Sequence, residues 1–346
     1  MSLLKSERLS KQLSLLDVYL ISTGAMFSSG FFLLPGIAAA ETGPSVVLAY
    51  LISGMLILPA LLSQAELATA MPRAGGAYYY LDRTLGPLMG TIGGLGTWLA
   101  LMLKSAFALI GIGIYLTLFF DVPFQPIAIA FTVLFCILNI LGARQSTGLL
   151  RWLVFTLLGI LTLFIIDGLA NIGSQGIGEL QRTRFTPFLQ HGVDGLLETV
   201  GLVFVSYVGL TKVATLAEEV KNPERNIPLG MSLSLTTVIA IYVIGVAIMV
   251  AVLGTGELGR PSLVPVAETA RHMFGWLPPR FGEFLLVLAA IAAFASMSNS
   301  GVLTASRYPL AMARDNLIPR QLATLGRFRT PVFAIILTCS ILILFL

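Results

Sequence analysis

The sequence predicts an all-α polytopic membrane protein, and three observations carry this prediction. Apolar residues make up 56% of the chain and charged residues only 11%, which gives a mean hydropathy of +0.91. Apolar runs of membrane length recur along the whole chain, as in proteins that cross the bilayer with several helices. Two of these runs are interrupted by small and polar residues, and paired interruptions favour a transporter over a passive membrane anchor.

The apolar runs predict nine membrane spans, the last of them incomplete. The first run continues past Leu33 with no cleavage pattern after a short core, so we expect a retained helix and no signal peptide. No separate soluble domain is visible. The expected spans lie near residues 17–40, 45–66, 88–120, 124–143, 149–169, 195–217, 229–254, 282–306 and 331–346.

The positive charges predict the orientation in the membrane. Most of the 21 Lys and Arg residues fall in segments on the same side as the N-terminus. The positive-inside rule then places the N-terminus in the cytoplasm. We expect an integral protein of the cell (plasma) membrane whose surroundings are the lipid bilayer. The basic excess follows the topology, so no nucleic-acid partner is expected, and the sequence does not indicate an oligomeric state.

The two interruptions predict a binding site inside the membrane. They cover residues 22–30 (STGAMFSSG) and 206–212 (SYVGLTK). Each unpaired backbone group in the hydrocarbon costs several kcal/mol, so non-helical backbone survives there only where it is buried in protein or lines a polar cavity. Two such segments in one chain therefore indicate a shared site.

Other kinds of chemistry have little support in the sequence. Cys136 and Cys339 are far apart in the sequence and are expected to be apolar packing residues. His191 and His272 have no ligand-spaced partner, so no metal site is expected beyond a candidate sodium site. The spans carry no paired carboxylates and no nucleophile beside a base, so an enzyme is not expected. No resident cofactor is expected.

Four distinct sequence motifs follow one another along the chain. They are residues 24–35 (GAMFSSGFFLLP), 65–67 with 71–80, 218–228 (EEVKNPERNIP), and 306–307 with 311–319. They resemble the first-helix signature, the end of the second helix with its following loop, and the loops after the sixth and eighth helices of the amino acid-polyamine-organocation (APC) superfamily. The chain is similar to these permeases over nearly its whole length.

The resemblance implies the leucine-transporter fold, which has two inverted five-helix repeats with broken first and sixth helices. The first repeat would cover about residues 17–170 and the second about 193–346, within a single transmembrane transporter domain of residues 1–346. The chain stops within an apolar run, so the second repeat would be truncated in its ninth helix and would lack its tenth. We therefore expect a fragment of a longer permease.

The breaks predict how a substrate would be held. A half-helix that begins after a break presents unpaired N–H groups and the positive end of its dipole, which suit a carboxylate. The unpaired carbonyls suit an ammonium group. The alternative is that the small residues only let helices pack closely. The predicted substrate-binding residues are Met26, Ser28, Ser29, Gly30, Val205, Val208 and Gly209.

Lys104 lies well inside the third span and is a candidate for charge coupling. Its expected partner is Glu66, Asp167 or a substrate carboxylate, and the alternative is that it snorkels to the interface. Lys212 follows the second break. Many members of the superfamily carry a carboxylate one position earlier, where this chain has Thr211.

The coupling ion stays open between a proton and sodium. The resemblance implies a sodium site built from the carbonyls of Gly24, Phe27 and Ala295 with the side-chain oxygens of Ser298 and Asn299. Interhelical hydrogen bonds explain the polar residues of the eighth span equally well. A proton would be carried most simply by Lys104.

The leading function is a secondary active transporter that moves amino acids or related amines by alternating access. Ion pairs between the segment 218–225 and Arg307, Arg314 or Asp315 are expected to close its inner side. The alternative is a membrane sensor that binds an amino acid on the same fold without net transport. The sequence names neither the amino acid nor the direction of transport.

Overall fold

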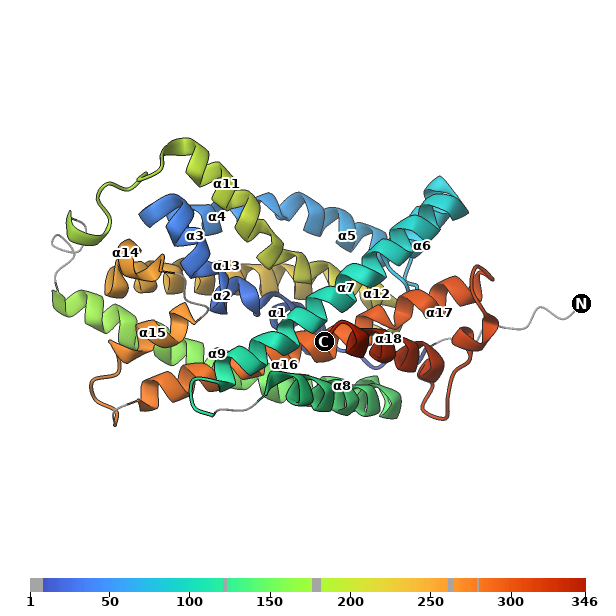
Figure 1. The fold of residues 1–346 in the computed structure, drawn as a ribbon. Coiled ribbons are helices and arrows are strands. Elements are labelled where there is room, and N and C mark those ends of the chain that lie inside the picture. The colour runs from blue at the N-terminus through green and yellow to red at the C-terminus, as the bar shows by residue number, and fades with distance from the viewer. Residues whose placement is uncertain (1–8, 121–122, 176–181, 261–263, 279) are drawn as a thin grey trace, which may run out of the picture.

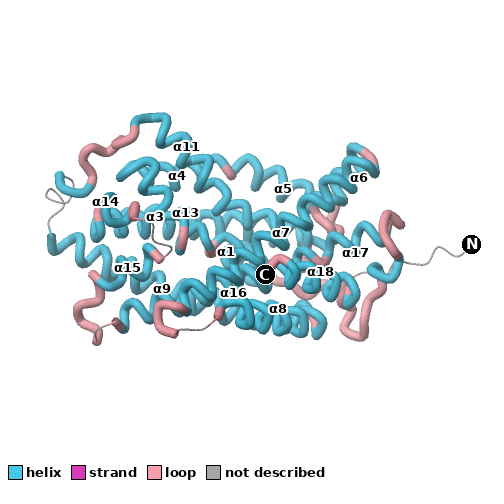
Figure 2. The backbone as a smooth tube through the Cα atoms, viewed as in Figure 1, coloured by secondary structure: helices cyan, strands magenta, loops and turns pink. Residues whose placement is uncertain are grey.

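The computed structural model describes residues 9–120, 123–175, 182–260, 264–278 and 280–346. Within these residues the chain is a bundle of helices, and the only paired extended segment is an isolated bridge between Leu13 and Val220. Figure 2 shows helices joined by short loops, and the long helices run roughly along one axis of the molecule (Figure 1).

The helices before the second break begin with three short segments and continue with longer ones. They are α1 (Leu15–Met26), α2 (Ser29–Phe32), α3 (Leu34–Thr42), η1 (Gly43–Ser45), α4 (Val46–Leu56), α5 (Leu58–Ala70), α6 (Ala77–Leu85), α7 (Pro87–Leu116), α8 (Phe124–Leu141) and α9 (Ala143–Gln175).

The remaining helices start with the segment that contains the second break. They are α11 (Gly192–Phe204), η2 (Val205–Thr211), α12 (Lys212–Thr215), η3 (Ala217–Glu219), α13 (Pro223–Leu253), α14 (Thr255–Leu258), α15 (Pro265–Arg271), α16 (Phe281–Ala305), α17 (Arg307–Arg314), η4 (Arg320–Ala323) and α18 (Val332–Leu344).

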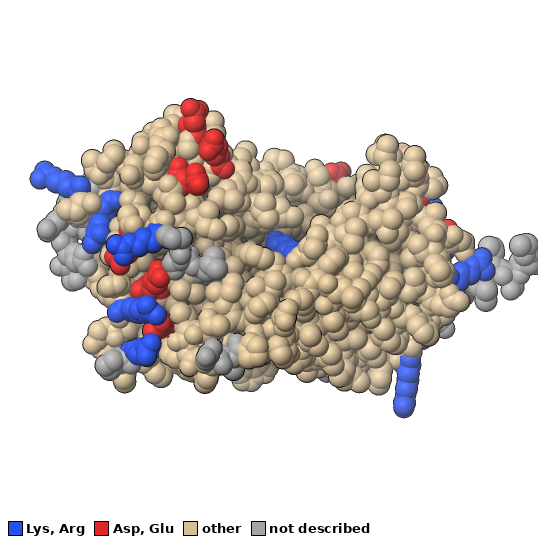
Figure 3. Space-filling view, in the orientation of Figure 1, with Lys and Arg blue, Asp and Glu red and all other residues tan. Residues whose placement is uncertain are grey.

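The length and surface of these helices confirm a polytopic membrane protein. Among the described residues, seven helical runs are long and apolar enough to cross a membrane, and α1 and α18 are shorter apolar helices. Large apolar side chains such as Leu62, Ile92 and Trp152 are more than half exposed, as lipid-facing residues are. On the face drawn in Figure 3, most charged side chains gather toward the two ends of the molecule, and the wide belt between them is uncharged apart from basic atoms near its centre.

The two ends of the bundle can be told apart by their short helices. Figure 1 shows α6 and α17 at one end, which we call the α6 end, and α14 and α15 at the other. The ion-paired loops described below lie at the α6 end. The positive-inside rule predicts that this end faces the cytoplasm.

The first break divides the expected span 17–40 into three helices. Helix α1 begins with a capping box in which Ser14 and Asp17 bond each other's backbone N–H groups. It ends at Met26, and Phe27 and Ser28 leave the helical conformation before α2 begins. Pro35 then opens α3, where its missing N–H costs no hydrogen bond. A chain turn at Gly43, whose φ is +69°, leads into α4.

The second break divides the expected span 195–217 into α11, η2 and α12. The seven residues of η2 are wound as a 3₁₀ helix, whose tighter turns have poorer hydrogen-bond geometry than an α-helix. At Gly209 this segment lies directly against α1, because a Cβ atom there would collide with the backbone carbonyl of Ala25. The two broken helices therefore cross in backbone contact.

The two cysteines lie on neighbouring helices of the bundle. Cys136 on α8 and Cys339 on α18 have their side chains within hydrogen-bonding reach, and neither forms a disulfide. They pack among apolar residues of the core. Their sequence separation gave no indication of this contact.

The backbone contact at Gly209 predicts a specific sensitivity to substitution. Gly209→Ala should lower the free energy of unfolding by about 1–3 kcal/mol, since backbone atoms cannot move aside cheaply. Gly201→Ala on α11 is the matched control, because a Cβ there meets no atom within 4 Å. Thermal unfolding of both variants in detergent measures the difference. Equal midpoints for the two would show that the crossing is loose.

Candidate functional site

Tyrosine hydroxyls satisfy the backbone around the first break. Tyr242 on α13 donates a hydrogen bond to the carbonyl of Met26 at 2.8 Å, and Tyr50 on α4 donates to Gly30 at 2.6 Å. Tyr115 on α7 donates to the carbonyl of Phe32, also at 2.6 Å. All three hydroxyls come from other helices, so these three carbonyls are paired by tertiary structure.

The rings of this cluster form a rigid wall beside the break. The ring of Tyr242 stacks on Phe31 with centroids 5.7 Å apart and meets the edge of Phe27 at 5.2 Å. Tyr207 on η2 packs against Tyr242 and donates a hydrogen bond to the carbonyl of Tyr50. The two breaks and α13 are thereby joined in one aromatic cluster.

The start of α2 has unused hydrogen-bonding groups. No side chain caps this helix at Ser28. The hydroxyl of Ser206, on η2, lies 2.5 Å from where a Cβ atom on Gly30 would stand. Ser206 is only 4% exposed, and its hydroxyl has no hydrogen-bond partner among the described residues. Leaving a buried hydroxyl without a hydrogen-bond partner costs about 1–3 kcal/mol of folding free energy. The Ser206 hydroxyl is therefore a candidate to bind a ligand.

A second group of unpartnered hydroxyls lies one turn earlier in α1. Ser22 and Thr23 are fully buried on α1, and Ser296 is fully buried on α16. Their hydroxyls have no hydrogen-bond partner within the described part of the chain. The Ser296 hydroxyl crowds the position of a Cβ on Gly24, so α1 and α16 are in close contact there.

The residues predicted to hold sodium are only partly brought together. Gly24 faces α16 at Ser296, and Ala295 is buried on the same helix. The hydroxyl of Ser298, however, donates to the carbonyl of Ser105 at 3.2 Å. Asn299 points to α8 and α9, where its side chain bonds Asn139 and Ser146. Phe27 is buried in the aromatic cluster.

The carbonyls predicted to bind an ammonium group already accept protein hydrogen bonds. Thr211 donates to Val208 at 3.0 Å, and the Lys104 ammonium donates to Val205 at 3.4 Å. A carbonyl oxygen has two lone pairs, so each retains capacity for a second donor. Both residues lie at the surface of the described chain, where Val208 is 39% exposed and Val205 is 56% exposed.

Neither of the two carboxylates of the chain expected beside Lys104, Asp167 and Glu66, pairs with it in the described structure. Asp167 instead accepts hydrogen bonds from the Phe274 backbone N–H and the Trp276 indole, at 2.9 and 2.7 Å. Glu66 is exposed on α5 and forms no ion pair in the part of the chain that the structure describes. The ammonium group of Lys104 therefore lies beside the second break rather than beside a carboxylate.

Lys212 is the second lysine at this break, and it is almost fully buried, at 2% exposure. Its ammonium group contacts the sulfur and carbonyl of Met297 at 3.0 and 3.3 Å and the hydroxyl of Ser300 at 3.4 Å, all on α16. Lys212 and Lys104 interact electrostatically. Two lysine side chains thus approach the second break, and no carboxylate is ion-paired to either among the described residues.

The α6 end is tied together by two neighbouring carboxylates of η3. Glu218 accepts hydrogen bonds from the N–H groups of Leu9 (2.8 Å) and Ala74 (3.0 Å) and pairs with Arg314 at 2.9 Å. Glu219 pairs with Arg307, which is completely buried, at 2.8 Å. The expected ion pairs of this segment with Arg307 and Arg314 are confirmed. Asp315 pairs instead with Arg83 of α6.

Burial raises the pKa of Glu218, but the Arg314 charge and the three hydrogen bonds together outweigh it. The pKa therefore lies below its ordinary value of 4.5. Burial and the hydrogen bond to Asp315 both raise the pKa of Tyr78, so this hydroxyl stays protonated and donates to Asp315 at 2.9 Å. The network is complete at neutral pH.

The fold is similar to that of a solved membrane protein. It resembles a Na⁺-coupled sialic acid symporter solved in a substrate-bound outward-open state, with a TM-score of 0.70, 12% identity, and coverage of 97% of this chain and 73% of that one. The expected all-α leucine-transporter fold is confirmed by this likeness. A family model described as amino acid permease matches residues 13–346. The chain belongs to the amino acid permease family.

Named relatives are transporters of several kinds. An uncharacterized transporter of Mycobacterium tuberculosis is 31% identical over 94% of this chain and 71% of its own length. The methylthioribose transporter of Bacillus subtilis is 26% identical over 94% of this chain and 72% of its own. Cationic amino acid transporter 1 of Arabidopsis thaliana is 25% identical over 97% of this chain and 58% of its own.

The tyrosine bonds predict that a single hydroxyl matters at the break. Tyr242→Phe keeps the ring and removes the donor to Met26, so the free energy of unfolding should fall by about 1 kcal/mol. Tyr19→Phe is the control, because its hydroxyl bonds only the side chain of Thr237 near the surface. Chemical unfolding in detergent measures both. A loss in Tyr19→Phe as large as in Tyr242→Phe would contradict the assignment.

The lowered pKa of Glu218 predicts a pH dependence with a definite sign. Its ionised form is favoured in the folded state, so the stabilisation is present above the ordinary pKa and is lost as pH falls through the lowered pKa. Unfolding midpoints should therefore drop on the acid side of pH 4.5. Glu218→Gln should flatten this drop, whereas Glu224→Gln, at an exposed position of α13, should leave it unchanged. If the unchanged protein and the two variants show the same dependence of the unfolding midpoint on pH, Glu218 is not the group responsible.

Proposed function

We propose that this chain forms the core of a secondary active transporter that moves an amino acid or a related amine by alternating access. The observation that carries the proposal is the unpartnered, buried hydroxyl of Ser206 beside Gly30, at the crossing of two broken helices. Such an unpaired group is costly unless a ligand completes it. The membership in the amino acid permease family supports the same substrate class.

The carboxylate of the substrate binds at the start of α2. The N–H groups of Ser29 and Gly30 and the Ser206 hydroxyl supply the donors, and the absence of a side-chain cap at Ser28 leaves this helix end to the ligand. The ammonium group binds the second lone pairs of the Met26 and Val208 carbonyls. Gly209 brings η2 close enough to α1 for one small molecule to touch both.

Either a proton or sodium couples to the substrate. The unpartnered hydroxyls of Ser22, Thr23 and Ser296 near Gly24 are hard oxygen donors of the kind that sodium prefers, and they differ from the Ser298 and Asn299 oxygens of the sequence prediction. Lys104 and Lys212 are the groups that would carry a proton. The ion pairs of Glu218 and Glu219 close the α6 end, which faces the cytoplasm in this proposal, as the positive-inside rule suggests.

The second candidate is a sensor that binds the amino acid at the same site without moving it. The ion-paired loops favour this possibility in one respect, because they lock the α6 end in the described state. A transporter must break these pairs in each cycle, whereas a sensor need not.

Uptake into proteoliposomes tests the proposal, with pH and sodium gradients imposed separately on a labelled amino acid mixture. We expect accumulation driven by one gradient. Ser206→Ala should raise the KM about tenfold, which corresponds to the loss of one hydrogen bond to a charged group. Ser232→Ala, exposed on α13, is the matched control. Binding of an amino acid without uptake in either gradient would favour the sensor, and neither binding nor uptake would refute the proposed site.

A further inference from the structure

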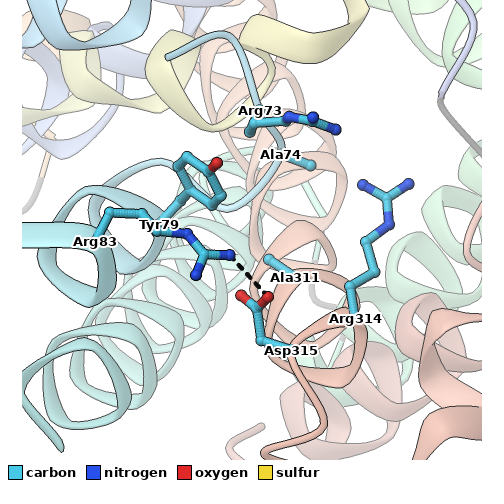
Figure 4. Close-up of a pocket in the computed structure, with 7 residues that line it drawn as sticks. All are labelled: Arg73, Ala74, Tyr79, Arg83, Ala311, Arg314 and Asp315. Carbon is cyan, nitrogen blue, oxygen red and sulfur yellow. Dashed lines mark hydrogen bonds and ion pairs between the residues drawn. The ribbon is translucent and has the colours of Figure 1, made fainter. Parts of the chain in front are cut away.

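A basic pocket lies at the α6 end, away from both breaks. Its volume is about 210 Å³. Arg73 and Ala74 reach it from the loop after α5, Tyr79 and Arg83 from α6, and Ala311, Arg314 and Asp315 from α17 and the residue after it (Figure 4). Three segments far apart in the sequence thus converge on one cavity.

The residues that line the pocket are mostly basic. Its lining has three guanidinium groups and a single carboxylate. That carboxylate, Asp315, is engaged by Arg83 at 3.0 Å and by the Tyr78 hydroxyl at 2.9 Å. Arg314 pairs with Glu218, outside the pocket lining. Arg83 also pairs with Asp82 at 3.3 Å, again outside the lining. The guanidinium of Arg73 has no ion pair within the described residues, so it is the group of this pocket that is left for an anion.

The geometry suits a small oxyanion. In Figure 4 the guanidinium groups of Arg73 and Arg314 extend toward each other on one side of the pocket, and the Arg83–Asp315 pair closes the other side. The Arg83 guanidinium also lies over the Tyr79 ring, 5.1 Å from its centre, which holds it in place. Guanidinium forks match the geometry of phosphate oxygens and bind them by charge-assisted hydrogen bonds.

Apolar surface next to the pocket indicates where such a phosphate comes from. Leu85, Leu88 and Met89 follow Arg83 closely in the chain and are 50–70% exposed. Helix α7, to which the last two belong, is one of the membrane-length helices. A phosphate in the pocket would therefore lie at the level where this helix enters the bilayer, with acyl chains able to cover the exposed leucines. Basic pockets at helix ends are known to bind lipid headgroups in this way.

We propose that the Arg73–Arg83–Arg314 pocket binds the phosphate of an anionic phospholipid headgroup. Because Arg314 also holds Glu218, the bound phosphate lies one side chain away from the ion pairs that tie the α6 end together. The lipid thereby contributes to the charge balance of this end. The proposal does not depend on which substrate the protein carries, or on whether it transports at all.

Binding of a fluorescent phosphatidylglycerol to the full chain in detergent micelles tests the proposal. Arg73→Gln should weaken binding about tenfold, because a charge-assisted hydrogen bond is lost. Arg73→Lys keeps the positive charge but lacks the two-pronged guanidinium geometry, so its affinity should lie between those of the unchanged protein and Arg73→Gln. Arg327→Gln is the matched control, since Arg327 is an exposed arginine outside the pocket lining. The unfolding midpoint of each variant shows that the fold is retained.

The outcomes separate the possible sources of the phosphate. Loss in Arg73→Gln but not in Arg327→Gln, with no competition by millimolar inorganic phosphate, supports a lipid site. If inorganic phosphate competes fully, the pocket binds a soluble phosphate and the proposal of a lipid ligand is wrong. Equal loss in Arg73→Gln and Arg327→Gln would overturn the pocket itself, because the lipid would then be attracted by general surface charge.

Discussion

The pairing of backbone groups at two broken helices is the constraint on which the rest of this structure depends. Within a bilayer, water cannot form hydrogen bonds with an unpaired backbone carbonyl or N–H group. Here the hydroxyls of Tyr50, Tyr115 and Tyr242 pair the carbonyls around the first break, and Gly209 lets the second break pack on the first. The donors that remain unsatisfied, above all Ser206, mark the place where a ligand is needed.

The breaks and the α6 end are mechanically connected. The peptide that leaves the second break runs through α12 into η3, whose carboxylates hold the N-terminal segment, the loop after α5 and α17. A buried ion pair that loses one partner leaves a costly uncompensated charge, so opening either of these pairs has an energetic cost. A rearrangement of η2 around a substrate would act directly on this network, as alternating access requires.

The sequence predicted the class of fold and the two breaks, because each depends on local composition and motif. It also named Arg307 and Arg314 among the possible partners of the segment 218–225. It did not predict the tyrosines, although a tyrosine inside an apolar span needs a hydrogen-bond partner and so carries a signal. Asp167 and Glu66 do not pair with Lys104, and sequence spacing could not show that Asp167 bonds Phe274 and Trp276 instead. The side-chain directions of Ser298 and Asn299 depend on helix rotation, which periodicity does not resolve.

The most direct measurement is an experimental structure of the protein in a lipid nanodisc with a bound amino acid, at a resolution that shows side-chain contacts. The account predicts ligand density between α2 and η2, with a carboxylate oxygen within hydrogen-bonding distance of the Ser206 hydroxyl and the Gly30 N–H. Density at any other place, with the Ser206 hydroxyl still unpartnered, would contradict the claim that the two broken helices form the substrate site.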